Sequence, residues 1–104
     1  MMSNKELTKV LRKTAKDFHR IGLMDDQTMR EFDAMCLPKV KQYTPVQIKK
    51  LRKHNRASQA VFAAYLNTNV STIQKWEQGQ KKPNGISLKL LSLIDRYGLT
   101  LLAA

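Results

Sequence analysis

The chain has 104 residues, enough for one compact domain with an extension, and a formal net charge of +11. Residues 1–37 hold seven Lys/Arg against six Asp/Glu, a balance of +1, whereas residues 38–104 hold twelve against two, a balance of +10. Such a charge favours phosphate backbones or anionic membranes as partners. No apolar run approaches the ~18–20 residues that span a bilayer, and the N-terminus lacks the apolar core of a secretory signal. The single cysteine, Cys36, excludes an internal disulfide and fits a reducing cytoplasm.

Residues 3–21 are predicted to form an amphipathic helix, because apolar side chains recur along them at helical spacing. The apolar stripe consists of Leu7, Val10, Leu11, Phe18 and Ile21. The remaining surface is crowded with the cations Lys5, Lys9, Arg12, Lys13, Lys16 and Arg20. The helix could lie on a membrane, pack on its own domain or dock on a partner. The membrane is the least favoured, since the helix has no Trp and no second anchoring signal.

A second short helix is expected after Gly22, capped by Asp25 or Asp26. In it Met29, Phe32 and either Met35 or Cys36 share one face. All five methionines lie within the first 35 residues. Methionine suits an adaptable contact surface, although gap filling and the start residue also explain such a set.

Residues 37–43 are predicted to be an extended linker, which could pair as a short strand. Pro38 disfavours helix in the residue before it, and the charge balance changes at this point. The sequence therefore divides into an N-terminal helical segment, 1–37, and a second domain, 38–104.

A third helix is expected to begin at Thr44-Pro45, a capping hydroxyl followed by a proline suited to the first helical position. Its apolar side consists of Val46, Ile48 and Leu51. Its cationic surface consists of Lys49, Lys50, Arg52 and Lys53, extended by Arg56. This surface suits either solubility or contact with phosphates.

Residues 58–83 are predicted to form two short helices joined by a tight turn, as in a helix-turn-helix. Ser58 suits the N-cap of the first helix. Its apolar face consists of Val61, Phe62, Tyr65 and Leu66. Asn67 tolerates the left-handed conformation that ends a helix, and Asn69 can cap the helix that follows.

The second of these helices buries Ile73 and Trp76, and Gly79 and Pro83 end it. The opposite, outward set consists of Val70, Ser71, Gln74 and Lys75, followed by Lys81 and Lys82. An amide can pair with adenine, a hydroxyl with either base and a valine methyl with thymine, while lysines suit phosphates. A solvated polar face is the alternative interpretation.

A last long helix follows the turn at Asn84-Gly85, and Gly98 ends it. Its apolar residues are Ile86, Leu90, Leu93, Ile94 and Tyr97, widened by Leu88 and Leu91, with Leu99, Leu101 and Leu102 as an apolar tail. An exposed patch of this kind points to a partner. We expect a homodimer through this helix and tail, which would present two recognition helices to major grooves roughly 34–36 Å apart.

The stretch 58–83 resembles the signature of the Cro/phage-repressor-type (XRE) helix-turn-helix family. The matching positions are Ser58, Gln59, Phe62, Ala63, Leu66, Ser71, Thr72, Ile73, Trp76, Glu77, Gly79 and Pro83. The wider stretch 37–98 is similar to HigA-type antitoxins, through Leu37-Pro38, Tyr43-Thr44-Pro45, Ile48, Leu51-Arg52, Gly85 and Leu88-Lys89-Leu90-Leu91 in addition. Asn67, Thr68 and Asn69 depart from the usual Gly, aliphatic residue and Ser of the family.

The resemblance implies an all-α fold, a Cro/repressor-like helix-turn-helix bundle with an N-terminal helical extension. It implies a cytoplasmic bacterial protein that binds an inverted-repeat operator as a dimer, represses its own operon and neutralises a HigB/RelE-like toxin that cleaves mRNA. It places Gln59 at the DNA backbone or beside the recognition residues, lets Asn69 and Thr72 reach phosphate, and calls for no cofactor.

Three classes of function remain distinguishable. In the first, residues 58–82 bind operator DNA and the N-terminal segment, disordered or folded when free, binds toxin through Leu7, Val10, Leu11, Phe18, Ile21, Met29 and Phe32. In the second, the chain is a stand-alone repressor without a toxin. The third, an enzyme, is disfavoured because His19, His54 and Cys36 are too scattered to form a catalytic or metal site.

Overall fold

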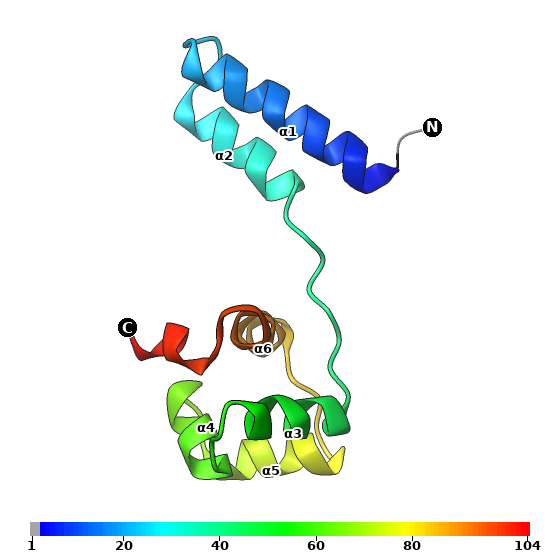
Figure 1. The fold of residues 1–104 in the computed structure, drawn as a ribbon, viewed down its shortest axis with the longest axis vertical. Helices are drawn as coiled ribbons and strands as arrows, with labels where there is room; N and C mark the ends of the chain where they lie inside the picture. Colours follow the sequence, from blue (N-terminus) through cyan, green and yellow to red (C-terminus); the bar gives the residue numbers. More distant parts are fainter. Residues whose placement is uncertain (1–2) are drawn as a thin grey trace. The chain divides into compact units, whose positions relative to one another are not determined.

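The computed structural model describes residues 3–104, and all regular structure in this range is helical (Figure 1), which confirms the predicted all-α fold. The chain separates into two compact units between Lys39 and Val40. Residues 37–43 are extended but pair with no strand, since the described residues contain none. We refer to residues 3–39 as the N-terminal unit and to residues 40–104 as the C-terminal unit.

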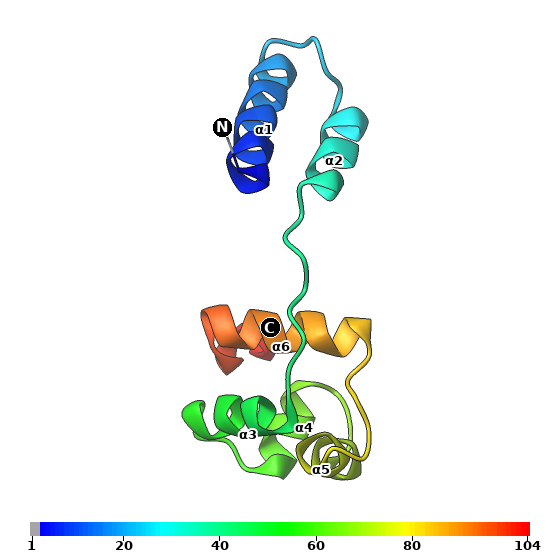
Figure 2. The same cartoon turned by 90° about the vertical axis from the view of Figure 1, so that its right-hand side faces the viewer.

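The N-terminal unit is an antiparallel hairpin of α1 (Asn4–Arg20) and α2 (Asp26–Met35), as Figure 2 shows. Ser3 caps α1 in a capping box with Glu6, and Asp25 caps α2 by accepting from the backbone N–H of Thr28. This hydrogen bond with Thr28 lowers the pKa of the Asp25 carboxyl. The helix ends are therefore fixed locally by side chains within the first turn.

The interior of this hairpin is small. Its buried apolar side chains are Ala15 of α1 and Met29 of α2. An ion pair between Arg12 and Asp33 at 3.1 Å and a hydrogen bond between His19 and Asp26 bridge the helices. Met29, predicted as a toxin contact, is only 7% exposed in this conformation and packs inside the hairpin.

The C-terminal unit holds four α-helices and a final 3-10 turn. They are α3 (Pro45–His54), α4 (Gln59–Tyr65), α5 (Val70–Gln78), α6 (Gly85–Tyr97) and η1 (Leu99–Ala103). Asparagine or hydroxyl side chains cap each α-helix, namely Thr44, Ser58, Asn69 and Asn84. The three caps predicted among them are confirmed, whereas Asn84, expected in a turn, is itself the cap of α6.

The core of the C-terminal unit is built where α5 contacts α3 and α4, and where α6 packs on α3. The fully buried side chains are Phe62, Ile48, Ile73, Leu91 and Ile94. Trp76 joins them at 4% exposure, so the predicted inward orientation of Ile73 and Trp76 is confirmed.

Some predicted core positions lie on the surface instead. Val46 is 64% exposed and Val61 45%. In α6 the buried stripe is Leu88, Leu91 and Ile94, whereas Ile86 and Tyr97 are exposed. Several leucines at helical spacing define two adjacent faces, and the packing on α3 selects one of them.

The leucine tail also differs from its prediction. Gly98 adopts a φ of +86°, which favours glycine, and the chain folds back so that Leu99 is buried and Leu102 packs on the core. The Asn55 side chain accepts a hydrogen bond of 3.1 Å from the backbone N–H of Leu99 and holds this turn. Leu101 alone of the three tail leucines stays exposed.

The beginning of the C-terminal unit is tied to α6. The Tyr43 hydroxyl donates to Asp95 at 2.9 Å, and the Lys41 ammonium lies 4.9 Å from the Tyr43 ring centroid. Burial, together with the hydrogen bond to Asp95, raises the pKa of Tyr43 to about 12. Residues 41–43 therefore belong to the folded domain although they form no helix.

Candidate nucleic-acid interface

The turn between α4 and α5 is formed by local chemistry. Leu66 ends α4, and Asn67 then adopts a φ of +54°, a left-handed conformation that Asn tolerates better than most residues. The backbone N–H of Asn67 donates to Ala64 and that of Thr68 to Ala63. Asn69 then caps α5, so two helices meet across a connection of a few residues, as in a helix-turn-helix.

The two faces of α5 differ sharply. Ile73 and Trp76 are buried, whereas Ser71, Gln74 and Lys75 are exposed. The exposed three stand at positions i, i+3 and i+4, so they share one side of the helix. A hydroxyl, an amide and a cation are thus presented together, and these are groups that can contact base edges and phosphates.

The other residues predicted to contact DNA differ in their exposure and in their hydrogen bonds. Val70 is partly buried and packs on the core, so only part of its side chain can meet a base. The side-chain oxygen Oδ1 of Asn69 accepts from the backbone N–H and the hydroxyl of Thr72, at 2.8 and 2.9 Å. Lys81 and Lys82, beyond the end of α5, are exposed.

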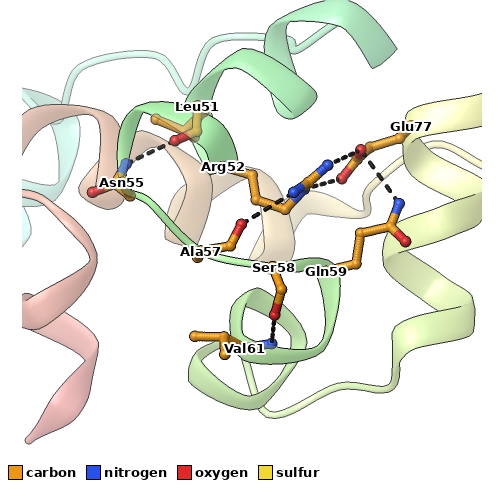
Figure 3. A network of polar contacts seen from close by, with 8 residues as sticks. All are labelled: Leu51, Arg52, Asn55, Ala57, Ser58, Gln59, Val61 and Glu77. Atoms are coloured by element: carbon orange, nitrogen blue, oxygen red, sulfur yellow. Dashed lines mark hydrogen bonds and ion pairs between the residues drawn. The ribbon is translucent and has the colours of Figure 1, made fainter.

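A buried ion pair fixes α5 against α3 (Figure 3). Arg52 donates to Glu77 through Nε at 2.7 Å and through Nη2 at 2.8 Å, and its Nη1 donates to the Ala57 carbonyl at 3.1 Å. The pair is almost wholly enclosed, with 11% and 5% of the two side chains exposed. Two parallel hydrogen bonds between charged groups are strong and directional.

The pair shifts both ionisation equilibria. Burial alone would raise the pKa of Glu77, but the hydrogen bonds and the charge of Arg52 outweigh it and lower that pKa. The hydrogen bond to Glu77 raises the pKa of Arg52. Gln59, at the start of α4, donates to the same carboxylate at 3.4 Å, so the amide of Gln59 is held beside α5.

The prediction that Arg52 belongs to the cationic surface of α3 is wrong, because the residue is only 9% exposed. The sequence pattern indicates this: Arg52 follows the buried Ile48 by four positions, and Glu77 follows the buried Ile73 by four positions. Both charges therefore fall on the inward sides of their helices. The other predicted cations of this surface, Lys49, Lys50, Lys53 and Arg56, are exposed.

The charge of the C-terminal unit is left almost uncompensated at its surface. Its two acidic residues are both engaged, Glu77 with Arg52 and Asp95 with Tyr43 and Lys41. The exposed cations around the helix-turn-helix therefore create a positive field that attracts a phosphate backbone.

Neither a metal site nor a membrane span is found in residues 3–104. Their His, Cys, Asp and Glu side chains form no group of three that could hold a metal ion. None of their helices is both long enough and apolar enough to cross a bilayer.

The fold of the C-terminal unit and the exposed polar side of α5 are those of a helix-turn-helix protein. The profile of the helix-turn-helix family matches residues 48–102, more than half of the chain, so the chain belongs to this family. It is an XRE-type DNA-binding protein, and its family is one of DNA-binding proteins rather than enzymes.

The chain is also similar in sequence to a protein that is named as an antitoxin. Over 58 residues the chain is 40% identical to the protein named Antitoxin HigA-2 of Vibrio cholerae serotype O1 (strain ATCC 39315 / El Tor Inaba N16961). The match covers 56% of this chain and 56% of the relative, so the chain spans little more than half of that protein's length.

Proposed function

We propose that the C-terminal unit binds an operator through the outward side of α5 and represses the operon of its own gene. The observation that carries this proposal is the division of α5, with Ile73 and Trp76 in the core and Ser71, Gln74 and Lys75 exposed. Gln59, Asn69, Val70 and Thr72 support these contacts at the groove edge, and Lys81 and Lys82 meet phosphates.

The operator-binding form is proposed to be a homodimer. A unit of about 65 residues buries only ~60% of its unfolded surface and gains stability from association. The outward side of α6 supplies apolar area in the exposed Ile86 and Tyr97 and the partly buried Leu93, and Leu101 of η1 is exposed as well, whereas Leu90 packs on the core. Light scattering at micromolar concentration should give twice the monomer mass, and a monomer would contradict the proposal.

The N-terminal unit is proposed to neutralise a HigB/RelE-like toxin, a ribonuclease that cleaves mRNA. Because α2 covers the side of α1 that carries Ala15, the apolar stripe of α1 is left open. Its residues Leu7, Val10, Leu11, Phe18 and Ile21 are 45–63% exposed, and Phe32 of α2 is partly buried. The name of the Vibrio relative supports the same role.

A hairpin of this size with two buried apolar side chains is marginal by itself. Units below about 40 residues usually need a disulfide, a metal or a partner to be stable. We therefore propose that the N-terminal unit gains order when the toxin covers the α1 stripe.

The experiment uses the full chain and the product of the neighbouring gene, which the proposal expects to be a small RelE-like protein. The double substitution Leu11→Asp/Phe18→Asp should abolish capture of that protein, because two charges would be buried in the contact. The control Val46→Asp places one such charge on a 64% exposed valine of the C-terminal unit and should leave capture intact. Full capture by the double variant would overturn the toxin-binding assignment.

A stand-alone repressor is the second candidate. The family match lies entirely within residues 48–102, and so it says nothing about the N-terminal unit. A gene without a small RelE-like neighbour, and a chain that binds DNA but captures no such protein, would favour this function.

A further inference from the structure

The charges of the N-terminal unit are divided unevenly between its helices: α1 carries six cations with Glu6 and Asp17, whereas α2 with its cap carries four acidic residues with Arg30. The cations Lys5, Lys9, Lys13, Lys16 and Arg20 are exposed on α1, whereas Asp25, Asp26, Glu31 and Asp33 lie on α2 or its cap. Although the net charge of residues 1–37 is only +1, one side of α1 is therefore strongly positive.

Four of these cations are left without an acidic partner. Arg12 is paired with Asp33 and Arg20 with Asp17 at 3.5 Å, but Lys5, Lys9, Lys13 and Lys16 make no ion pair with any described residue. We call these four the lysine row. Their spacing of four, four and three residues keeps them on one side of the helix, over roughly 17 Å at 1.5 Å per residue.

The lysine row and the apolar stripe of α1 face different directions. Lys9 and Lys16 are about half a turn away from Leu7 and Phe18, at 3.6 residues per turn. On a membrane, an amphipathic helix buries its apolar side and its lysines attract anionic headgroups, but α1 has no Trp and no second anchoring signal. A polyanion that approaches the lysine side meets all four charges while the apolar stripe stays free.

We propose that the lysine row is a second DNA contact, made to the phosphates of the duplex that flanks the site bound by α5. This rests on the DNA binding of the helix-turn-helix and goes beyond its proposed operator function. The extended residues 37–40, which precede the part tied to α6, span at most about 14 Å, roughly four base pairs of 3.4 Å. So short a linker keeps the lysine row at high effective concentration near DNA already held by α5.

Such a contact is independent of base sequence and sensitive to salt. Each neutralised phosphate steepens the dependence of log K on log salt by about 0.9. Four lysines that meet two or three phosphates should therefore contribute about 2 to 3 to the salt exponent. They lengthen the DNA footprint and leave the preferred sequence unchanged.

The test compares the full chain with a variant in which Lys5, Lys9, Lys13 and Lys16 are each replaced by Gln, which keeps helix propensity nearly constant. The probes are two duplexes, a short one trimmed to the site selected by the wild-type chain and a long one with about ten base pairs added on each side. The variant should bind the short duplex as the wild type does. On the long duplex its salt exponent should be smaller by about 2 to 3, with affinity at 0.1 M salt at least ten-fold weaker.

A charge-matched control separates contact from net charge. Lys9→Gln/Lys13→Gln and Lys89→Gln/Arg96→Gln each remove two exposed cations, from α1 and α6 respectively. Only the first pair should reduce the exponent on the long duplex more than on the short one. Equal effects of the two pairs would assign the change to net charge and overturn the proposal.

Two further outcomes would overturn it. The proposal would be overturned if the wild type and the four-lysine variant had equal salt exponents on the long duplex. Recognition of DNA through α5 would not be affected by that result. Binding of the wild type to phosphatidylserine vesicles that the variant loses, with no change on DNA, would assign the lysine row to a membrane surface. Failure of the wild type to select any duplex from random sequence would instead contradict the operator function itself.

Discussion

The ion pair between Arg52 and Glu77 gives the sharpest stability prediction. Replacing Glu77 by Gln removes the charge that compensates a guanidinium only 11% exposed, and leaves Arg52 with the Ala57 carbonyl and a neutral amide. Breaking a buried pair by removing one partner costs ~3–5 kcal/mol. A unit of about 65 residues has a total stability of roughly 3–10 kcal/mol, so Glu77→Gln should leave the C-terminal unit marginally folded.

The pair also predicts a pH dependence of a definite sign. The folded state lowers the pKa of Glu77 below its ordinary value of 4.5. A carboxyl of this kind stabilises the fold fully above its unfolded pKa, and the contribution is lost as pH falls through the lower, folded pKa. As the pH is lowered from about 4.5, the free energy of unfolding of the wild type should therefore decrease as Glu77 is protonated. The Glu77→Gln variant should not show this decrease.

The assay is urea denaturation of the full chain followed by Trp76 fluorescence, which reports on the core of the C-terminal unit. The control Lys41→Gln breaks an exposed pair with Asp95 at 3.8 Å and should cost no more than about 1 kcal/mol. Arg52→Met/Glu77→Leu should recover most of the loss, because apolar side chains can replace a buried pair. A loss below 1 kcal/mol for Glu77→Gln would refute the reasoning.

Four single substitutions extend these predictions. Gln74→Ala should weaken binding to the preferred site by ~1–3 kcal/mol more than binding to other sequences, and a gel-shift comparison that shows equal losses would limit Gln74 to backbone contact. Trp76→Ala should cost ~3–5 kcal/mol of unfolding free energy in urea, because the ring is in the core. Asn67→Gly should raise the melting temperature slightly, because residue 67 has a φ of +54° and glycine adopts this conformation with less strain than any other residue. Tyr43→Phe should lose ~0.5–1.5 kcal/mol with the hydrogen bond to Asp95, and an unchanged denaturation midpoint would show that this bond adds nothing.

Local signals in the sequence located the helix-turn-helix well. Ser58 and Asn69 were expected to cap helices and do so, and Gly79 ends α5 in the left-handed conformation. These features depend on a few neighbouring residues, so a single sequence is enough to identify them. The inward orientation of Ile73 and Trp76 follows in the same way from their spacing of three.

Features that depend on tertiary packing were predicted less well. In α6 the sequence offers two apolar faces, and only the contact with α3 decides that Leu88 and Leu91 are buried while Ile86 is exposed. Met29 was expected at a partner surface because residue type alone cannot show that α2 folds back on α1. Arg52 was placed outside because its charge was weighed without its partner, which lies 25 residues further along the chain.

The most direct test of the central proposal, that the outward side of α5 reads DNA, is an NMR titration of the full ¹⁵N-labelled chain with a duplex that it selects from random sequence. We predict the largest shift changes at Ser71, Gln74 and Lys75, with smaller changes at Lys81 and Lys82. Changes concentrated on α6, with these α5 signals unmoved at saturation, would contradict it.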